Sequence, residues 1–449
     1  MRTFNSGSTG RAKLLWAVLA LCWLALLFDG FDLFMYGAVL PDLLADRQFG
    51  LTEGLAGTLG SVATFGMLIG ALCTGIVTDR WGRRRALIGG VLLFSIASAV
   101  CAAAPTLEIF GLGRFVGGLG LGGLIPTAIA MILEFAPLPR RNLMIATLMT
   151  GHNAGGILAA TAGIAVVPSF GWRAMFWLGA APLVLVIPAM LRWLPESFAY
   201  LKSLGRTREM ARIAARWRVD PQDFLPAETE SAADQRTPAR ASLRSLLRPG
   251  TRSLTLFFWL ASFFGLLLVY GVSAWLPSMM KANGYELGPA IGFLLAINAG
   301  GVAGMLLAGP LADRWGALKV ALAWFALTAV GVLVLGIRMP LVLTFAVAFA
   351  TGVWLFSAQT MVYASVGSAF PVSSRATAIG WTSGVGRLGA VVGPWLGGVL
   401  AASAEPALSF AAFASAGIFG AIALVFASGR IRRTSRPQTH PATAPKPLR

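Results

Sequence analysis

Twelve long apolar runs constrain this chain more than any other feature of its sequence. Each holds about 20 residues or more with few charges, the length that an α-helix needs to cross the hydrocarbon core of a bilayer. Charge clusters and Pro or Gly breaks separate the runs. We therefore predict an all-α membrane protein with twelve spanning helices near residues 14–41, 54–78, 86–104, 108–133, 143–168, 173–194, 253–280, 288–311, 317–337, 340–367, 376–402 and 406–429.

The composition excludes an ordinary soluble protein. Hydrophobic residues make up 57% of the chain and charged residues 12%, whereas soluble domains carry about 25% charged residues. The three cysteines, Cys22, Cys73 and Cys101, lie inside apolar runs and form no CxxC pattern. With two histidines besides, the sequence supports neither a disulfide framework nor a metal site, and we expect no cofactor.

The distribution of basic residues predicts how the spans are oriented. By the positive-inside rule, the connections richest in Lys and Arg face the cytoplasm. Basic residues gather before the first span, between spans two and three, in the long segment after span six and in the tail. The connections of the opposite side carry Arg47, Arg173, Lys281 and Arg338. We predict a multi-pass protein of a bacterial-type inner membrane with both termini cytoplasmic, and we attribute the net charge of +18 to this orientation, not to nucleic acid.

A polar segment from Pro195 to Arg252 divides the spans six and six. We predict an N-terminal six-helix bundle over residues 1–195, a cytoplasmic linker over 196–252, a C-terminal six-helix bundle over 253–429 and a disordered basic tail over 430–449. Within the linker, Lys202 to Arg218 is expected to form a surface helix.

The two halves repeat each other. Gly75-xxx-Asp79-Arg80-Trp81-Gly82 recurs as Gly309-xxx-Asp313-Arg314-Trp315-Gly316, an offset of 234 residues (309 − 75). Tyr36 and Tyr270, Arg141 and Arg375, and Gly155 and Gly389 match at the same offset. Parallel repeats of six spans imply a two-fold axis along the membrane normal and a substrate site at mid-membrane between the halves, which is the architecture of a transporter.

The repeated motif resembles the loop signature of the major facilitator superfamily, most clearly as Gly75-xxx-Asp79-Arg80-x-Gly82-Arg83-Arg84. Three more segments resemble the aromatic acid:proton symporter family within it: Asp29-Gly-Phe-Asp32, the Gly-rich segment that begins at Arg114, and Gly384-Val-Gly-Arg387 through Pro394. The resemblance covers all twelve spans. It implies a monomer with the major facilitator fold that moves protons and an aromatic acid such as benzoate or a hydroxybenzoate.

Charged residues within spans are costly, about 2.5–3.5 kcal/mol each on insertion scales, and tend to be functional. Asp29 and Asp32 stand three apart on one helical face, which Tyr36 continues. Burial and like charge favour the protonated form of at least one carboxyl, so we expect proton coupling there. The alternative is that the acids pair with Arg114 or cap a broken helix. For Arg114 the resemblance implies proton coupling or substrate binding, and the alternative is an end residue that snorkels to the surface.

Arg387 lies within a Gly-rich span of the second half. Its planar guanidinium requires an anion and fits a carboxylate with two parallel bonds. The spans of that half hold no acidic residue away from their ends, so the partner is an N-terminal Asp or, as we favour, the carboxylate of the substrate. Other polar or aromatic candidates for the substrate site, each of which could instead serve packing, are Tyr36, His152, Asn153, Tyr270, Asn298, Trp354, Gln359 and Tyr363.

The charged connections between spans two and three suggest a further role. Ion pairs formed there in one access state and broken in the other constitute a conformational latch. We expect the latch to comprise Gly75, Asp79, Arg80, Gly82, Arg83, Arg84, Glu134, Arg141, Asp313 and Arg314, and the alternative is charge that only sets orientation.

Three other functions would each require a feature that this sequence lacks. A proton antiporter that exports drugs or organic-anion metabolites often carries a Gly-Pro pair in span five, and Gly151–Gly156 has no proline. A membrane enzyme needs a catalytic cluster, but no HExxH, His-rich box or Ser/His/Asp set is present. A sensor needs a signalling domain, for which the linker and tail are too short. We predict proton-coupled import, with the antiporter as the alternative.

Overall fold

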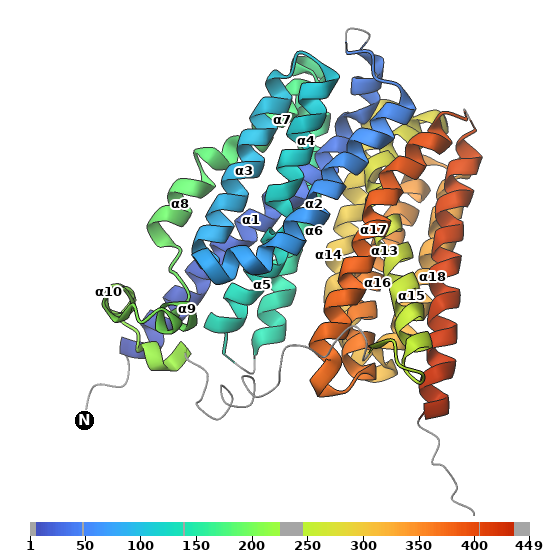
Figure 1. Ribbon diagram of the computed structural model, residues 1–449. Helices are drawn as coiled ribbons and strands as arrows, with labels where there is room; N and C mark the ends of the chain where they lie inside the picture. The colour runs from blue at the N-terminus through green and yellow to red at the C-terminus, as the bar shows by residue number, and fades with distance from the viewer. Residues whose placement is uncertain (1–5, 47–48, 138–139, 225–245, 404, 435–449) are drawn as a thin grey trace, which may run out of the picture.

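The computed structural model describes residues 6–46, 49–137, 140–224, 246–403 and 405–434. Twelve helical stretches of this described chain are long and apolar enough to cross a membrane, which confirms the predicted count. Two helical bundles stand side by side, one from residues 6–193 in blue to green and one from residues 252–434 in yellow to red (Figure 1). The predicted pair of six-span bundles is therefore present.

The helices extend a few residues beyond the apolar runs because their polar ends stay helical; Thr52, for example, caps the second helix with its hydroxyl. The N-terminal bundle contains α1 (Ser6–Ala45), α2 (Glu53–Trp81), α3 (Arg83–Ala103), α4 (Leu107–Gly122), α5 (Leu124–Phe135), α6 (Arg141–Phe170), α7 (Trp172–Gly179) and α8 (Val186–Trp193). The connecting segment contains α9 (Phe198–Ser203), α10 (Thr207–Trp217) and a 3₁₀ turn (Pro221–Phe224). The C-terminal bundle contains α13 (Arg252–Ala282), α14 (Leu287–Trp315), α15 (Ala317–Leu335), α16 (Leu341–Ala369), α17 (Val372–Ala401) and α18 (Pro406–Thr434).

Two spans that were predicted as single helices are interrupted. Span four breaks at Gly123 into α4 and α5, and Pro126 follows in the first turn of α5. Span six breaks into α7, a 3₁₀ turn at Ala181–Leu183 and α8, with Pro182 inside the turn. In both places a glycine or proline weakens the helix, and proline also removes a backbone donor.

Two predictions for the polar segments are corrected. The expected single helix from Lys202 to Arg218 is two helices, because Gly205 adopts a left-handed φ of 66° after α9. The tail predicted as disordered from Arg430 is helical as far as Thr434, since Ile431 still packs on the hydrophobic core. Residues 225–245 of the predicted linker and 435–449 of the predicted tail lie outside the described residues.

The sequence repeat reappears as a repeat of packing. In the N-terminal bundle α2 packs on α4, and in the C-terminal bundle α14 packs on α16. Gly66 lies directly against the backbone carbonyl of Phe115, and Gly300 lies against that of Phe349. Both partners of the second contact are displaced from those of the first by the same 234 residues (300 − 66 and 349 − 115). Glycines at these positions let the helix backbones touch, as is common between membrane helices.

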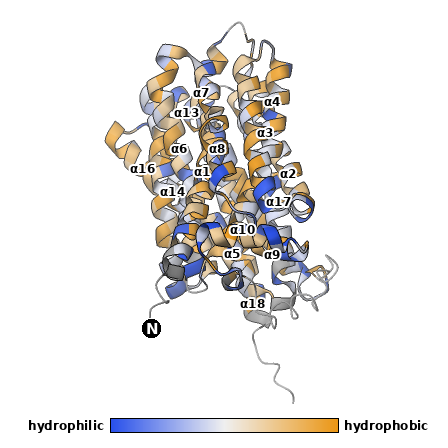
Figure 2. Cartoon of the chain, turned by 90° about the vertical axis from the view of Figure 1, so that its left-hand side faces the viewer, coloured by the Kyte–Doolittle hydropathy of each residue, from blue (hydrophilic) through white to orange (hydrophobic). Residues whose placement is uncertain are grey.

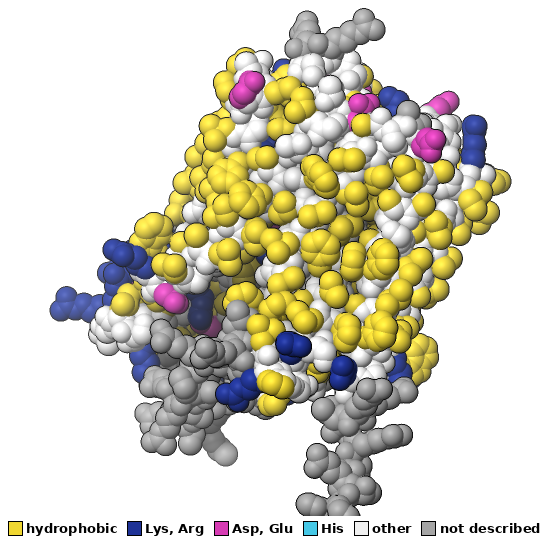
Figure 3. Space-filling view, turned by 45° about the vertical axis from the view of Figure 1, so that its right-hand side comes forward, with side chains coloured by type: hydrophobic (Ala, Val, Ile, Leu, Met, Phe, Trp, Pro, Cys, Tyr) yellow, Lys and Arg dark blue, Asp and Glu magenta, His cyan; other side chains and the backbone are white. Residues whose placement is uncertain are grey.

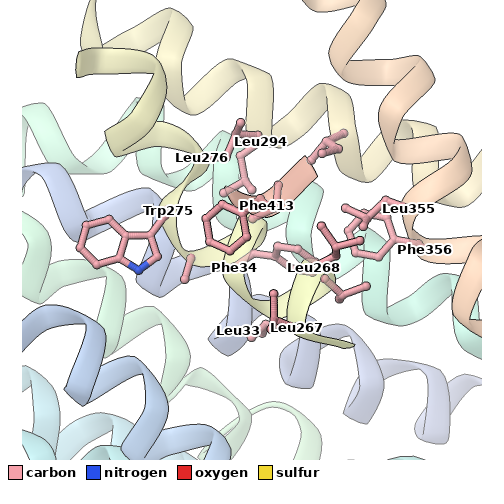
Figure 4. Packing of buried hydrophobic residues seen from close by; sticks show 14 of the residues in the cluster. Leu33, Phe34, Leu267, Leu268, Trp275, Leu276, Leu294, Leu355, Phe356 and Phe413 are labelled. Carbon is pink, nitrogen blue, oxygen red and sulfur yellow. The ribbon is translucent and has the colours of Figure 1, made fainter. Parts of the chain in front are cut away.

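Apolar side chains from both bundles form one buried cluster at their interface. The ring of Phe34 from α1 meets that of Phe356 from α16 at 5.8 Å between centroids. Leu268 and Trp275 of α13 belong to the same cluster (Figure 4). Hydrophilic residues gather instead at the end of the molecule that carries α9 and α10 (Figure 2).

The bundles meet at one end and separate at the other. We call the end where α1 begins and α18 ends the terminal end, and the opposite one the far end. In the far half, the Ser61 hydroxyl of α2 donates to the Val391 carbonyl of α17 at 2.6 Å, and the backbone of Gly57 meets that of Gly398. Toward the terminal end, side chains of α2 are exposed, and a Cβ added at Gly384 of α17 would meet no atom within 4 Å. The α2–α17 contact thus closes the far end of the molecule but not the terminal end.

Candidate transport site

Asp29 of α1 is paired with His152 of α6. The two helices approach closely because Gly30 lies directly on the backbone of His152 and Gly155 on that of Leu27. This contact brings Nδ1 of His152 to 3.0 Å from Oδ2 of Asp29. Asp29 is 3% exposed, so the pair is a buried acid with one basic neighbour.

Asp32 of α1 is paired with Arg114 of α4. Nη1 of Arg114 donates to both carboxylate oxygens, at 3.1 and 3.0 Å. The guanidinium lies 5.1 Å from the ring centre of Tyr36, whose hydroxyl donates to the Ala56 carbonyl at 2.6 Å. Arg114 is therefore a buried ion-pair partner, not a side chain that reaches the surface. The two acids on one face of α1 thus have separate basic partners on two other helices.

Arg387 of α17 has no acidic partner in the described part of the chain. Nη2 donates to the carbonyl of Gly122 at 3.4 Å, and the two α1 acids are already paired elsewhere. The Gly122 carbonyl is free to accept because Pro126, four residues on, lacks the N–H that would bond to it in a regular helix. A proline in α5 thereby orients an arginine of the opposite bundle, and the arginine keeps donors for an anion.

Tyr270 of α13 lies near both Arg387 of its own bundle and Asp29 of the N-terminal bundle. It is close enough to interact electrostatically with Arg387, with Asp29 of the other bundle and with Tyr363 of α16. Phe34 also bridges the bundles, since its ring lies 5.6 Å from that of His152 and 5.8 Å from that of Phe356. An arginine, an acid and several rings therefore lie in the same region, where the bundles face each other.

Two buried asparagines belong to the same interface. Asn153 of α6 donates to the sulfur of Met305 in α14 at 3.5 Å, and Asn298 of α14 packs on Gly156 of α6. The Oδ1 atoms of both asparagines are buried without a hydrogen-bond partner among the described residues. Such acceptors can take a hydrogen bond from a ligand or a water molecule.

Not every predicted substrate residue joins this group. Nε2 of Gln359 donates to the hydroxyl of Ser262 at 2.8 Å within the C-terminal bundle. Trp354 is half-buried in α16, and no described contact connects it to Arg387. Sequence reasoning missed the Gly122 carbonyl and the ring of Phe356 as parts of the interface. Gly123 and Pro126, breaks inside an apolar run, were the available signal for the first.

The basic connection between α2 and α3 is bound by residues at the end of α5 and at the start of the segment that follows α8. Arg83 forms an ion pair with Glu134 at the end of α5 and donates to the hydroxyl of Ser197 at 3.2 Å. The backbone N–H of Arg84 donates to Glu196 at 3.0 Å, and its guanidinium donates to the Leu191 carbonyl at 2.7 Å. Sequence reasoning missed Glu196 and Ser197, although Pro195-Glu196-Ser197 directly before α9 was a visible capping signal.

The other predicted latch residues take different positions. Asp79 is exposed and lines, with Arg83, Thr74 and Tyr200, a polar cavity of about 600 Å³ on the terminal-end side of the N-terminal bundle. The Arg80 carbonyl accepts from the Tyr200 hydroxyl at 2.9 Å. Asp313 and Arg314 of the second copy are exposed, Gly75 has open space around it, and Arg141 is partly buried. The ion-pair partner of Glu134, another predicted latch residue, is Arg83.

Gly82 and Gly316, the matched glycines of the two motifs, both have a φ of 87°. This left-handed region favours glycine, so the repeat extends to backbone conformation.

A second cavity, of about 490 Å³, lies at the far end between Glu53, Trp275, Lys281 and Glu405. Neither cavity contains Arg387 or Asp29, which lie between them along the molecule.

Comparison with known proteins identifies the superfamily that has this architecture. The sequence model of the Major Facilitator Superfamily matches residues 22–305 and 286–449. A crystal structure of the D-xylose-proton symporter is 18% identical, covers 92% of this chain and 97% of its own, and gives a TM-score of 0.72. The inward-open xylose transporter of Escherichia coli, also 18% identical, covers 92% and 96% with a TM-score of 0.73. At this identity the solved structures show the shared fold. The chain belongs to the major facilitator superfamily, and it is a transporter, not an enzyme.

Its relatives narrow the class. The gentisate transporter of Corynebacterium glutamicum is 34% identical over 91% of this chain and 86% of its own. The benzoate transport protein of Acinetobacter baylyi is 32% identical over 86% and 83%. The 4-hydroxybenzoate transporter of Pseudomonas aeruginosa is 31% identical over 86% of each. These relatives confirm the predicted resemblance to the aromatic acid transporters within the superfamily.

Proposed function

We propose that this protein imports an aromatic carboxylate together with protons across a bacterial inner membrane, by alternating access, as a monomer with both termini in the cytoplasm. The observation that carries the proposal is the position of Arg387. Its guanidinium lies at the interface of the bundles without an acidic partner among the described residues, close to Tyr270. An unpaired cation at mid-membrane is costly, and the carboxylate of a substrate would neutralise it.

The relatives support an aromatic ring as the rest of the substrate, because they are named for gentisate, benzoate and 4-hydroxybenzoate. Tyr270, Tyr363 and Phe34 supply rings near Arg387 and Asp29. Offset or edge-on stacking of a substrate ring is worth about 0.5–1.5 kcal/mol per pair. The unpaired Oδ1 atoms of Asn153 and Asn298 could accept from a ring hydroxyl.

Proton coupling is assigned to Asp29, Asp32 and Arg114. With the far end open, protonation of one acid lowers the charge cost of bringing an anion to mid-membrane. The carboxylate docks on Arg387, the bundles rock, and the proton leaves on the other side. One proton per monoanion is electroneutral, whereas two would add the membrane potential, about 2.3 kcal/mol per charge for each 100 mV.

Alternating access is supported by the contact between α2 and α17 at the far end. If the terminal end is cytoplasmic, as the basic residues predict, this arrangement is inward-facing. The ion pair of Arg83 with Glu134 and the exposed Asp79 would then belong to a latch that rearranges when the terminal end closes.

Uptake of labelled benzoate and 4-hydroxybenzoate into proteoliposomes with an imposed inward proton gradient tests this proposal. Accumulation that collapses when a protonophore is added is the expected result. If the folded protein takes up neither acid, the aromatic substrate is wrong; if accumulation above the external concentration persists with the protonophore, the proton coupling is wrong.

A further inference from the structure

The surface helix α10 presents two unlike faces. Met210, Ile213 and Trp217 pack on the hydrophobic core of the N-terminal bundle, and Ala214 is buried between them. Gly10 of α1 lies directly against the backbone carbonyls of Trp217 and Arg218. The apolar face of α10 is thus fixed against the start of α1, and its orientation on the bundle is defined.

The opposite side of α10 is strongly basic. We define the α10 basic face as six exposed residues of α10 and its surroundings: Lys202 of α9, Arg206 and Arg218 at the two ends of α10, and Arg208, Arg212 and Arg216 within it. Arg206 pairs with Glu209 at 3.6 Å, and both of these side chains are largely exposed. Among the described residues, no ion pair involves the other five cations. This face therefore carries an excess of positive charge that the protein itself leaves accessible.

Exposed tryptophans locate this face at the edge of the membrane. Trp16 of α1 is 59% exposed and Trp193, the last residue of α8, is 46% exposed. The guanidinium of Arg192 lies 5.7 Å from the ring centre of Trp193. Tryptophan concentrates at the level of lipid headgroups, and α10 lies below α8, next to α9, in the N-terminal half of the molecule (Figure 1). Lys and Arg side chains project from this end of the molecule, below its apolar belt (Figure 3).

We propose that the α10 basic face binds anionic phospholipid headgroups of the adjacent leaflet. Guanidinium groups donate paired hydrogen bonds to phosphate oxygens, and clustered cations next to a membrane helix are attracted to anionic lipid. The apolar face is already buried, so the helix contacts lipid through its arginines. That this leaflet is the cytoplasmic one rests on the orientation proposed above; the binding itself does not.

Lipid bound there would hold the terminal end of α1 at the membrane surface. The same helix carries Asp29 and Asp32, so the lipid fixes the bundle against which the C-terminal bundle moves. Anionic lipid is expected to support transport in addition to binding.

Titration of the full-length protein in detergent with fluorescent phosphatidylglycerol or phosphatidylcholine tests the proposal. The variant combines Arg208→Gln, Arg212→Gln and Arg216→Gln. The matched control removes three exposed cations in or next to the C-terminal bundle, by Arg248→Gln, Arg252→Gln and Lys319→Gln. Phosphatidylglycerol should bind the unaltered protein at least about tenfold more tightly than phosphatidylcholine, and the α10 variant should lose that preference while the control retains it.

Two results would overturn the proposal. One is undiminished binding of phosphatidylglycerol by an α10 variant whose thermal unfolding matches the unaltered protein. The other is complete displacement of the lipid by inorganic phosphate at equal concentration, which would make this a site for small anions. Because binding is measured without transport, neither result depends on whether the protein carries aromatic acids.

Discussion

Asp32 and Arg114 form a buried ion pair in which one nitrogen serves both carboxylate oxygens. Nη1 of Arg114 lies 3.1 and 3.0 Å from the two oxygens of Asp32, and Nε of Arg114 has no partner among the described residues. The pair therefore lacks the two-nitrogen fork that makes arginine–carboxylate contacts strongest. Protonation of Asp32 would remove its electrostatic component, so this pair suits a group that must gain and lose a proton.

Substitution of Asp32 tests that role. Asp32→Asn should abolish proton-driven accumulation while substrate exchange continues, because the amide cannot release a proton. The change also leaves Arg114 as an uncompensated buried charge, which can cost about 3–5 kcal/mol of stability. The double variant Asp32→Asn with Arg114→Gln is the control, since it removes both charges. It should recover thermal stability without accumulation, and intact accumulation in either variant would remove Asp32 from the coupling role.

Substitutions of Asp29 and His152 test whether Asp29 carries a coupled proton in addition to Asp32. Asp29→Asn should weaken accumulation if this acid also carries a proton, because its carboxyl faces His152 at 3.0 Å. His152→Gln keeps the carboxyl and a hydrogen-bonding side chain, so it should retain accumulation at a lower rate. Uptake and exchange measured in parallel separate coupling from binding. If both substitutions leave the accumulation ratio unchanged, coupling belongs to Asp32 alone.

Arg387 is expected to bind the substrate carboxylate through its planar fork. Arg387→Lys keeps the charge but removes the fork, so the KM for uptake should rise about tenfold or more. Arg375→Lys is the matched control, because Arg375 is an exposed residue of the same helix. An unchanged KM in the Arg387→Lys transporter contradicts the assignment.

Substitutions of the two motif glycines, Gly82 and Gly316, should reduce the stability of the protein by unequal amounts. Gly82→Ala and Gly316→Ala each place a side chain at a φ of 87°, which costs about 1–2 kcal/mol. At Gly82 the added Cβ would also meet Glu196 and Tyr200, whereas it meets nothing within 4 Å at Gly316. Thermal unfolding should therefore show a larger loss for Gly82→Ala. Equal losses would mean that Glu196 is not held tightly against the α2–α3 connection.

Closure of the far end depends on small residues. Gly57→Leu should prevent α2 from meeting α17 at Gly398, and so favour the state in which the terminal end closes. A cysteine introduced at Gly384, in a Cys73→Ser background, would then react more slowly with a polar alkylating reagent. Gly54→Leu is the control, because this glycine has no neighbour within 4 Å. Equal reaction rates in both variants would argue against far-end closure by this contact.

The twelve spans, their repeat and the few intramembrane charges could all be predicted from the amino-acid sequence. Each depends on a local property: an apolar run of spanning length, a motif copied at 234 residues (309 − 75), or a charge whose burial in lipid is costly. Those properties can be predicted from the sequence without knowing which helices are neighbours. The interruptions at Gly123 and Pro182 are harder to predict from the sequence, because a glycine or proline inside an apolar run is also compatible with a continuous membrane helix.

The partners of the buried charged residues depend on how the helices pack in three dimensions. Asp29 contacts His152 and Asp32 contacts Arg114, Arg387 donates to Gly122, and Glu134 pairs with Arg83. Membrane helices are apolar on nearly every side, so hydrophobic periodicity does not reveal which face meets which neighbour. That choice follows from close backbone contacts, such as Gly30 on His152 and Gly155 on Leu27, which exist once the helices have packed.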